Sequence, residues 1–269
     1  MPNWGAFAGF VGVVLGGLLL LAHASSGLLS GDADGETRAS SEAPHADDAV
    51  DTYPATPTDR VVSAPSVADE RLRPDLSTGA LLVNVAVSQG LFGSLLVVGA
   101  WYTGVPAAAF GVDAAAVGTI PLAAGVGLGV ALYAVNEAGS TASDRFGLGD
   151  GDALREALAP DSVAGWAVLL FVVLPTIAGF EELLFRGALV GAFVAGFGVS
   201  PWLLAALSSV AFALGHGAQG PGGVVVTGLL GFVLAAAFVL TGSLATVVVA
   251  HYLVNALEFV VHEGAGVAW

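Results

Sequence analysis

The sequence predicts an all-α fold, a polytopic transmembrane helical bundle of about seven spans. Of the 269 residues, 56% are hydrophobic and 11% are charged, whereas soluble domains average about 25% charged residues. The mean hydropathy is +0.84. Several apolar runs reach the length of about 20 residues that a helix needs to cross the hydrocarbon core. We therefore expect a multi-pass protein of the cell membrane, in constant contact with the lipid bilayer.

The charge and cysteine content narrow the function classes. The formal net charge is −15, and the chain contains no lysine and no cysteine. An acidic surface repels nucleic acid, so we expect no nucleic-acid partner. A chain without cysteine has neither disulfides nor a thiol nucleophile. The lack of lysine with abundant Asp, Ala, Val and Gly resembles the composition of halophilic archaeal proteins, whose acidic surfaces are screened by high salt.

The N-terminal region divides into an apolar and a polar part. Residues 1–29 are mostly apolar from Trp4 onward, and we interpret them as a first transmembrane helix or signal-like segment. Ala22-His23-Ala24 resembles a signal-peptidase site, so cleavage of residues 1–24 is the alternative, although the basic region that normally precedes such a run is missing. Residues 30–78 are acidic and polar without apolar periodicity, which predicts a disordered tether.

Residues 79–162 are predicted to hold two transmembrane helices and a cytosolic loop. The helices are Gly79–Trp101 and about Ala114–Val135, and the loop runs from Asn136 to Ser162. Within the loop, Asp152–Leu158 has the composition of a short surface helix.

Residues 163–269 are predicted to form a core of four transmembrane helices, separated by turns rich in glycine, proline and serine. Pro175 lies inside the first helix and is expected to bend or break it. The four predicted helices are Val163–Ala195, Trp202–Gly217, Val224–Leu240 and Leu244–His262.

Orientation is predicted from the arginines, because cytoplasmic loops carry an excess of basic residues. All arginines except Arg186 lie in the tether or in the 136–162 loop. With seven spans, these two segments are on the same side of the membrane. We expect that side to be cytosolic, with the N-terminus outside and the C-terminus in the cytosol.

One stretch of the core carries charges at membrane depth. Glu181, Glu182 and Arg186 lie within an otherwise apolar run, where one isolated charge costs about 2.5–3.5 kcal/mol. Glu182 and Arg186 are spaced i, i+4 and share a helix face, while Glu181 points about 100° away. We therefore predict a supporting ion pair and a second carboxylate that is free for another task. Intramembrane charges of this kind indicate a functional site.

Two histidines fall at a similar depth. At 1.5 Å per residue, Glu181 and His216 both lie about 24–28 Å from the turn at Phe197. His251 lies about 13 Å beyond the turn at Gly242. These side chains are therefore expected to meet in one cavity toward the cytosolic half of the membrane.

The last helix carries a polar stripe on an otherwise apolar surface. Its members follow the helical spacing i, i+4, i+7 and i+11, and they are His251, Asn255, Glu258 and His262. We interpret the last two, Glu258 and His262, as interfacial residues.

Three patterns together resemble a known family. They are Glu181-Glu182-x-x-x-Arg186, Phe212-x-x-x-His216 and His251-x-x-x-Asn255, in this order. Each is weak alone, but together in membrane spans they resemble the CPBP family of intramembrane proteases, which includes the CAAX prenyl endopeptidases and ABI-type proteins. The resemblance covers about Val163 to His262 and implies that residues 163–269 are a CPBP-like catalytic core.

The resemblance implies a peptidase, a glutamate-type intramembrane endopeptidase that cuts a peptide or membrane-protein substrate near the cytosolic face. Glu181 with His216 would activate a water molecule, and His251 with Asn255 would form the oxyanion hole. Glu182 and Arg186 would support them. Neither a metal nor another cofactor is implied.

Three alternatives remain open. A zinc-dependent intramembrane protease, with metalloendopeptidase activity, would use His216, His251 and one of the two glutamates as ligands, since three ligands and a water make a workable zinc site. The sequence has no H-E-x-x-H helix, however. A non-catalytic membrane scaffold is the second alternative. A small proton-relaying transporter is the third, although the inverted repeats frequent in transporters are missing from the sequence.

Overall fold

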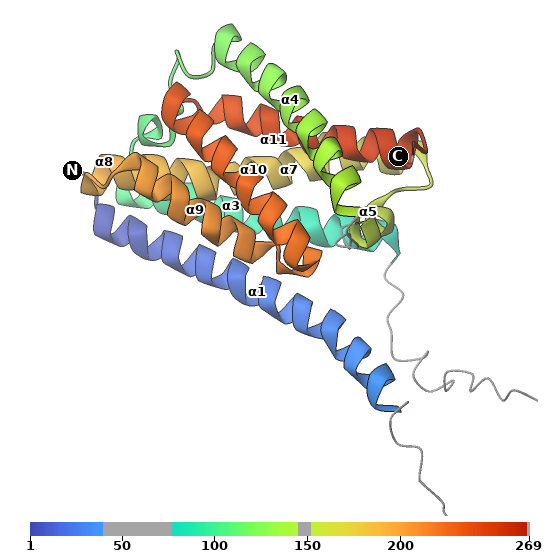
Figure 1. The fold of residues 1–269 in the computed structure, drawn as a ribbon. Helices are drawn as coiled ribbons and strands as arrows, with labels where there is room; N and C mark the ends of the chain where they lie inside the picture. The colour runs from blue at the N-terminus through green and yellow to red at the C-terminus, as the bar shows by residue number, and fades with distance from the viewer. Residues whose placement is uncertain (40–76, 145–151, 268–269) are drawn as a thin grey trace, which may run out of the picture.

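The computed structural model of the protein describes the backbone of residues 1–39, 77–144 and 152–267. Within these ranges every regular element is a helix, and six helices are long and apolar enough to cross a membrane. The apolar helix Pro201–Gly215 is shorter, with 15 residues. The predicted all-α, multi-pass bundle is confirmed (Figure 1).

The elements include α-helices, 3-10 helices (η1 and η4) and π-helices (η2, η3 and η5). In chain order they are α1 (Trp4–Ala39), α3 (Thr78–Thr103), η1 (Ala107–Phe110), α4 (Thr119–Asp144), α5 (Asp152–Leu158), α6 (Val163–Val168), η2 (Leu169–Val173), α7 (Leu174–Glu182), η3 (Leu183–Ala192), α8 (Phe193–Phe197), α9 (Pro201–Gly215), η4 (Gly217–Gln219), α10 (Gly220–Thr241), α11 (Leu244–Glu258) and η5 (Phe259–Gly264).

Serine and glycine set the ends of the helices. A serine hydroxyl at the N-cap accepts a hydrogen bond from the backbone N–H three residues later, which satisfies a donor that the first turn leaves open. This occurs at Ser77, Ser162, Ser200 and Ser243. Helices end at left-handed glycines, a conformation that costs glycine little, at Gly104, Gly198 and Gly242.

The helix that carries the charged stretch is one continuous run from Val163 to Phe197, built from α6, η2, α7, η3 and α8. Pro175 does not break it. The π-helix η2 ends at Val173, two residues before this proline, and its wider turn accommodates a residue that cannot donate a backbone hydrogen bond.

This run lies in the middle of the bundle. Its segments α7 and η3 contact α3, α9, α10 and α11, while α4 packs against α11 and α1 packs against α3 and α9 (Figure 1). The outer faces of the bundle are apolar. Trp101, Ile120 and Val163 are each at least 80% exposed, as suits side chains that face lipid.

Three boundaries differ from the sequence-based prediction. Helix α4 continues to Asp144, so Asn136 and the residues after it are helical where a loop was predicted. Helix α10 begins at Gly220 instead of after the predicted turn, because Pro221 fits the first turn of a helix. Helix α1 extends to Ala39, into the predicted tether. Residues 40–76, most of that tether, lie outside the described residues.

Candidate active site

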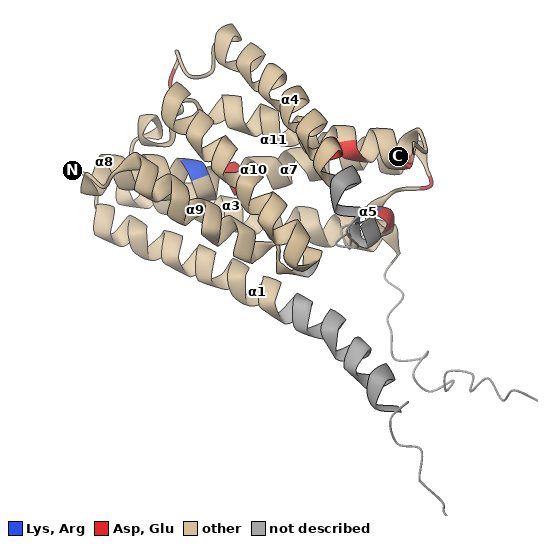
Figure 2. Ribbon diagram, viewed as in Figure 1, with Lys and Arg blue, Asp and Glu red and all other residues tan. Residues whose placement is uncertain are grey.

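Three charged side chains of the central run are buried in the bundle. Glu181 is 7% exposed, and Glu182 and Arg186 are 0% exposed. Figure 2 shows an acidic and a basic segment near each other in this central place, among helices that are otherwise without charged residues there. Buried charges require partners. Arg186 and Glu182 have several, whereas Glu181 has fewer.

Arg186 is bonded on two sides. Its Nη1 donates to Glu182 Oε1 at 2.7 Å, and its Nη2 donates to the backbone oxygen of Gly231, on α10, at 2.7 Å. The guanidinium carbon lies 4.7 Å from the ring centroid of Phe212. A Cβ atom on Gly231 would lie 2.9 Å from Phe212 Cδ1, so only glycine lets the α10 backbone come this close.

Glu182 also orients His251. The Nδ1 atom of His251, on α11, lies 2.7 Å from Glu182 Oε1. Because an ionised carboxylate only accepts, Nδ1 carries the proton in this bond. The other ring nitrogen, Nε2, lies 3.7 Å from Glu181 Oε2. His251 thus lies between the paired and the free carboxylate.

His216 joins this group through Phe212. It follows the last residue of α9, and its Nδ1 donates to the backbone oxygen of Phe212 at 2.8 Å. The Phe212 ring centroid lies 4.5 Å from that of His216 and 6.0 Å from that of His251. In a neutral His216, Nε2 is therefore an acceptor.

Several polar atoms of the site have no partner among the described residues. Glu181 Oε2, Glu182 Oε2 and Arg186 Nε are buried without a hydrogen bond. Asn255, half-buried one turn after His251, has no described residue bonded to its side chain. Such buried orphan atoms are rare in folded proteins, and these three belong to the residues of one motif, Glu181-Glu182-x-x-x-Arg186.

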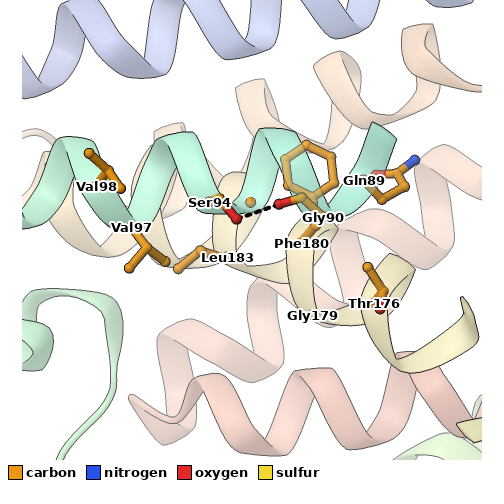
Figure 3. A pocket seen from close by; sticks show the side chains of 10 residues that line it. Gln89, Gly90, Ser94, Val97, Val98, Thr176, Gly179, Phe180 and Leu183 are labelled. Atoms are coloured by element: carbon orange, nitrogen blue, oxygen red, sulfur yellow. Dashed lines mark hydrogen bonds between the residues drawn. The ribbon is translucent and has the colours of Figure 1, made fainter. Parts of the chain in front are cut away.

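A cavity of about 440 Å³ lies on a different side of α7, against α3 (Figure 3). Most residues that line it are small or apolar, and they include Gln89, Gly90, Gly93, Thr176 and Phe180. None of the four predicted catalytic side chains lines it. This cavity is therefore separate from the cluster of glutamate and histidine side chains.

The structure thus brings Glu181, Glu182, Arg186 and His251 into direct proximity and connects His216 to them through Phe212. Asn255 lies on the same helix as His251, and among the described residues its side chain has no hydrogen bond to the others. Sequence reasoning missed Gly231, whose only signal was a glycine inside an apolar helix. Phe212 was named only as the first residue of the second motif, and the proximity of its ring to both imidazoles is visible only in three dimensions.

Two sets of residues offer atoms for a metal. His216 and His251 each bond through Nδ1 and leave Nε2 available. Of the described residues, the group with three ligand atoms within 4.8 Å of one another is Glu137, Glu258 and His262, toward the C-terminal end of α11.

Residues 163–257 match the model of a protein family described as type II CAAX prenyl endopeptidase Rce1-like. The match begins at α6 and ends within α11, and it contains all three motifs. The family resemblance predicted from those motifs is confirmed. No curated protein and no solved structure matches the chain.

Proposed function

We propose that residues 163–257, an Rce1-like CAAX endopeptidase domain, make this protein an intramembrane endopeptidase that uses a glutamate-activated water. The observation that carries the proposal is Glu181, whose buried Oε2 has no hydrogen-bond partner in the described part of the chain and faces His251 Nε2 at 3.7 Å. A carboxylate with an open acceptor, next to an imidazole, is suited to take a proton from water.

In the first step, Glu181 takes one proton from the water while the water oxygen bonds to the carbonyl carbon of the substrate. His216 assists as a second acceptor, because its Nδ1 proton is held by the Phe212 carbonyl and Nε2 retains a lone pair. The two residues come from different helices: Glu181 lies on α7, and His216 follows the last residue of α9.

The negative charge that forms on the carbonyl oxygen needs donors. The Asn255 amide donates N–H, and His251 donates from Nε2 when that atom is protonated. Glu182 accepts a hydrogen bond from Nδ1–H of His251 and thereby fixes the orientation of the ring. Arg186 in turn donates a hydrogen bond to Glu182 and fixes its position. When the tetrahedral intermediate collapses, the C–N bond breaks and the proton on Glu181 passes to the leaving nitrogen.

The proposed substrate is a peptide or membrane-protein segment, and a prenylated C-terminal peptide is the first to test, as the family description suggests. We also propose that cleavage occurs near the cytosolic face, with the N-terminus outside. The support for this orientation is the position of the arginines in the sequence.

The test is cleavage of a farnesylated peptide by the full chain in detergent micelles, with the products identified by mass spectrometry. Glu181→Gln is expected to lower the rate by about 10²–10⁴-fold without lowering the thermal unfolding midpoint. Glu263→Gln, which removes a carboxylate distant from the site, is the control. Wild-type activity in Glu181→Gln would end the proposal.

If the wild type leaves this peptide intact, membrane peptides from cells with intact Glu181 and with Glu181→Gln are compared by mass spectrometry. Peptides that differ between the two identify the substrate. Identical peptide sets favour the non-catalytic scaffold.

A zinc-dependent protease is the second candidate, favoured by one observation. His216 and His251 both donate Nδ1–H to an oxygen and leave Nε2 available, the arrangement that zinc-binding histidines use. Glu181 would supply the third ligand. Activity that is lost in chelator and restored by zinc, in a His262→Gln background, would establish this mechanism in place of the metal-free one.

A further inference from the structure

A second polar cluster lies where α4 and α11 end together. The two helices approach closely at glycines of α4. A Cβ atom on Gly125 would lie 2.6 Å from the backbone oxygen of Thr246, and one on Gly129 would lie 2.9 Å from the backbone oxygen of Ala250. Small residues allow such backbone contact between membrane helices. The side chains that follow on α4 are therefore held directly against the end of α11.

These side chains form a connected group. The Asn136 amide donates to Glu258 Oε1. Glu137 Oε1 lies 2.8 Å from His262 Nε2, and Glu258 Oε2 lies 3.7 Å from the same nitrogen. All three ionisable side chains are 14–16% exposed. Figure 2 shows acidic segments at this end of α11, apart from those in the centre of the bundle.

The tautomer of His262 is set by a backbone oxygen. Its Nδ1 lies 2.9 Å from the oxygen of Val267, and a carbonyl only accepts, so Nδ1 carries a proton. In a neutral ring, Nε2 then presents a lone pair to two carboxylates. Three acceptors that face one another repel unless a cation lies among them, either a proton on Nε2 or a metal ion.

The groups around His262 are mainly carboxylates. Glu137 and Glu258 both face its Nε2. Glu258 and Glu263 both contact Arg155, whose Nε donates to Glu263 Oε1 at 2.8 Å and whose Nη1 lies 3.4 Å from Glu258 Oε2. A site with this many carboxylate oxygens suits a cation.

We propose that Glu137, Glu258 and His262 bind one zinc ion, or a similar divalent transition metal, that clamps α4 to α11. Their ligand atoms lie within 4.8 Å of one another. Tetrahedral zinc with bonds of about 2.0–2.1 Å separates its ligands by about 3.3 Å, and the distances of 2.8 and 3.7 Å to His262 Nε2 bracket that value.

The groups around these ligands also suit a metal site. Asn136 holds the second oxygen of Glu258, and Val267 holds the second nitrogen of His262. Metal ligands regularly have such outer partners, which fix their orientation. Imidazole nitrogen with carboxylate oxygen suits zinc or manganese better than magnesium, which prefers oxygen ligands alone.

The ion would act on the helix that carries His251 and Asn255, since both lie on α11. It would hold the end of α11 against α4 and, through Arg155, against α5. This clamp is independent of the proposed peptidase chemistry, because its ligands do not overlap with that site.

The test uses the full chain in micelles, freed of metal with a chelator and titrated with zinc chloride in a calorimeter. We expect one saturable equivalent and a higher thermal unfolding midpoint. X-ray absorption of the zinc-loaded wild type is expected to show one imidazole and oxygen ligands. Two imidazoles would place the ion at His216 and His251 and would overturn the proposal.

Variants locate the site independently of activity. Glu258→Gln and His262→Gln are expected to abolish saturable zinc binding, and Asn136→Ala to weaken it about 10–100-fold. His251→Gln, which lies outside the cluster, is the matched control that retains wild-type affinity. Wild-type zinc affinity in His262→Gln overturns the proposal. The proposal is also overturned if the wild type binds no zinc and its thermal unfolding midpoint rises only when the pH is lowered. If a variant does not fold, the wild-type absorption spectrum decides.

Discussion

The two polar regions along α11 differ in burial and in how completely their carboxylates are hydrogen-bonded. In the central site the charged side chains are at most 10% exposed. One oxygen of Glu182 accepts from both Arg186 and His251, and Glu181 Oε2 has no hydrogen-bond partner among the described residues. At the end of the helix the side chains are 14–21% exposed, and each carboxylate has a bonded oxygen. The first region has carboxylate oxygens that can still accept a hydrogen bond from a bound molecule. In the second region the side chains bond to one another and so connect the helices.

Burial also changes what one ion pair contributes. A charge that loses its partner inside a protein remains desolvated and costs about 3–5 kcal/mol. A partly exposed charge regains water, and pairs of that kind contribute about 0–1 kcal/mol. The same substitution, arginine to methionine, should therefore separate the two regions.

Arg186→Met should have the largest effect on folding. It leaves Glu182 buried with His251 as its remaining partner and removes the bond to the Gly231 oxygen, so we expect a loss of about 3–5 kcal/mol in unfolding free energy. Denaturant unfolding in micelles measures it. A loss below about 1 kcal/mol would mean that the pair is dispensable for the fold.

Asn255→Ala tests the open groups of the central site. If its amide stabilises the oxyanion, kcat should fall about 10²–10³-fold, equivalent to about 2.7–4 kcal/mol, with little change in KM or in stability. Asn136→Ala removes an amide of the other region and should leave kcat near the wild-type value. A change confined to KM would assign Asn255 to substrate binding instead.

Much of this contrast was readable in the sequence. Apolar runs predicted the spans, and the i, i+4 spacing of Glu182 and Arg186 predicted that they share a face, because a helix has a fixed period. The bounds of α5, Asp152–Leu158, were also predicted. Each of these inferences depends on a local pattern, which a single helix is sufficient to express.

The rest depends on neighbours that are far apart in sequence. Asn136 was predicted to begin a loop because the run becomes polar there, yet it is helical and bonded to Glu258. No pattern on α10 indicates that the Gly231 oxygen accepts from Arg186. Which atom of His251 faces Glu181 likewise depends on how α11 and α7 pack, and a spacing rule carries no information about that.

Gly129→Ala should disturb the clamp region by an intermediate amount. Its Cβ would lie 2.8 Å from Leu253 Cβ and 2.9 Å from the Ala250 oxygen, and such overpacking costs about 1–3 kcal/mol. Gly127→Ala on the same helix is the control, since its Cβ meets nothing within 4 Å and alanine favours the helix by about 1 kcal/mol. Equal stability of the two variants would contradict the close contact of α4 and α11.

Arg155→Met should have the smallest effect and so completes the comparison with Arg186→Met. The Arg155 side chain is 21% exposed and bridges Glu258 and Glu263, so its loss should cost about 0–1 kcal/mol, and less in high salt because salt screens exposed pairs. The effect of Arg186→Met should not change with salt, because its pair is enclosed by apolar helices. A salt series of denaturant unfolding measures both variants. A large, salt-independent loss for Arg155→Met would show that the end of α11 is as enclosed as its middle, and the distinction between an open site and a bridged clamp would no longer hold.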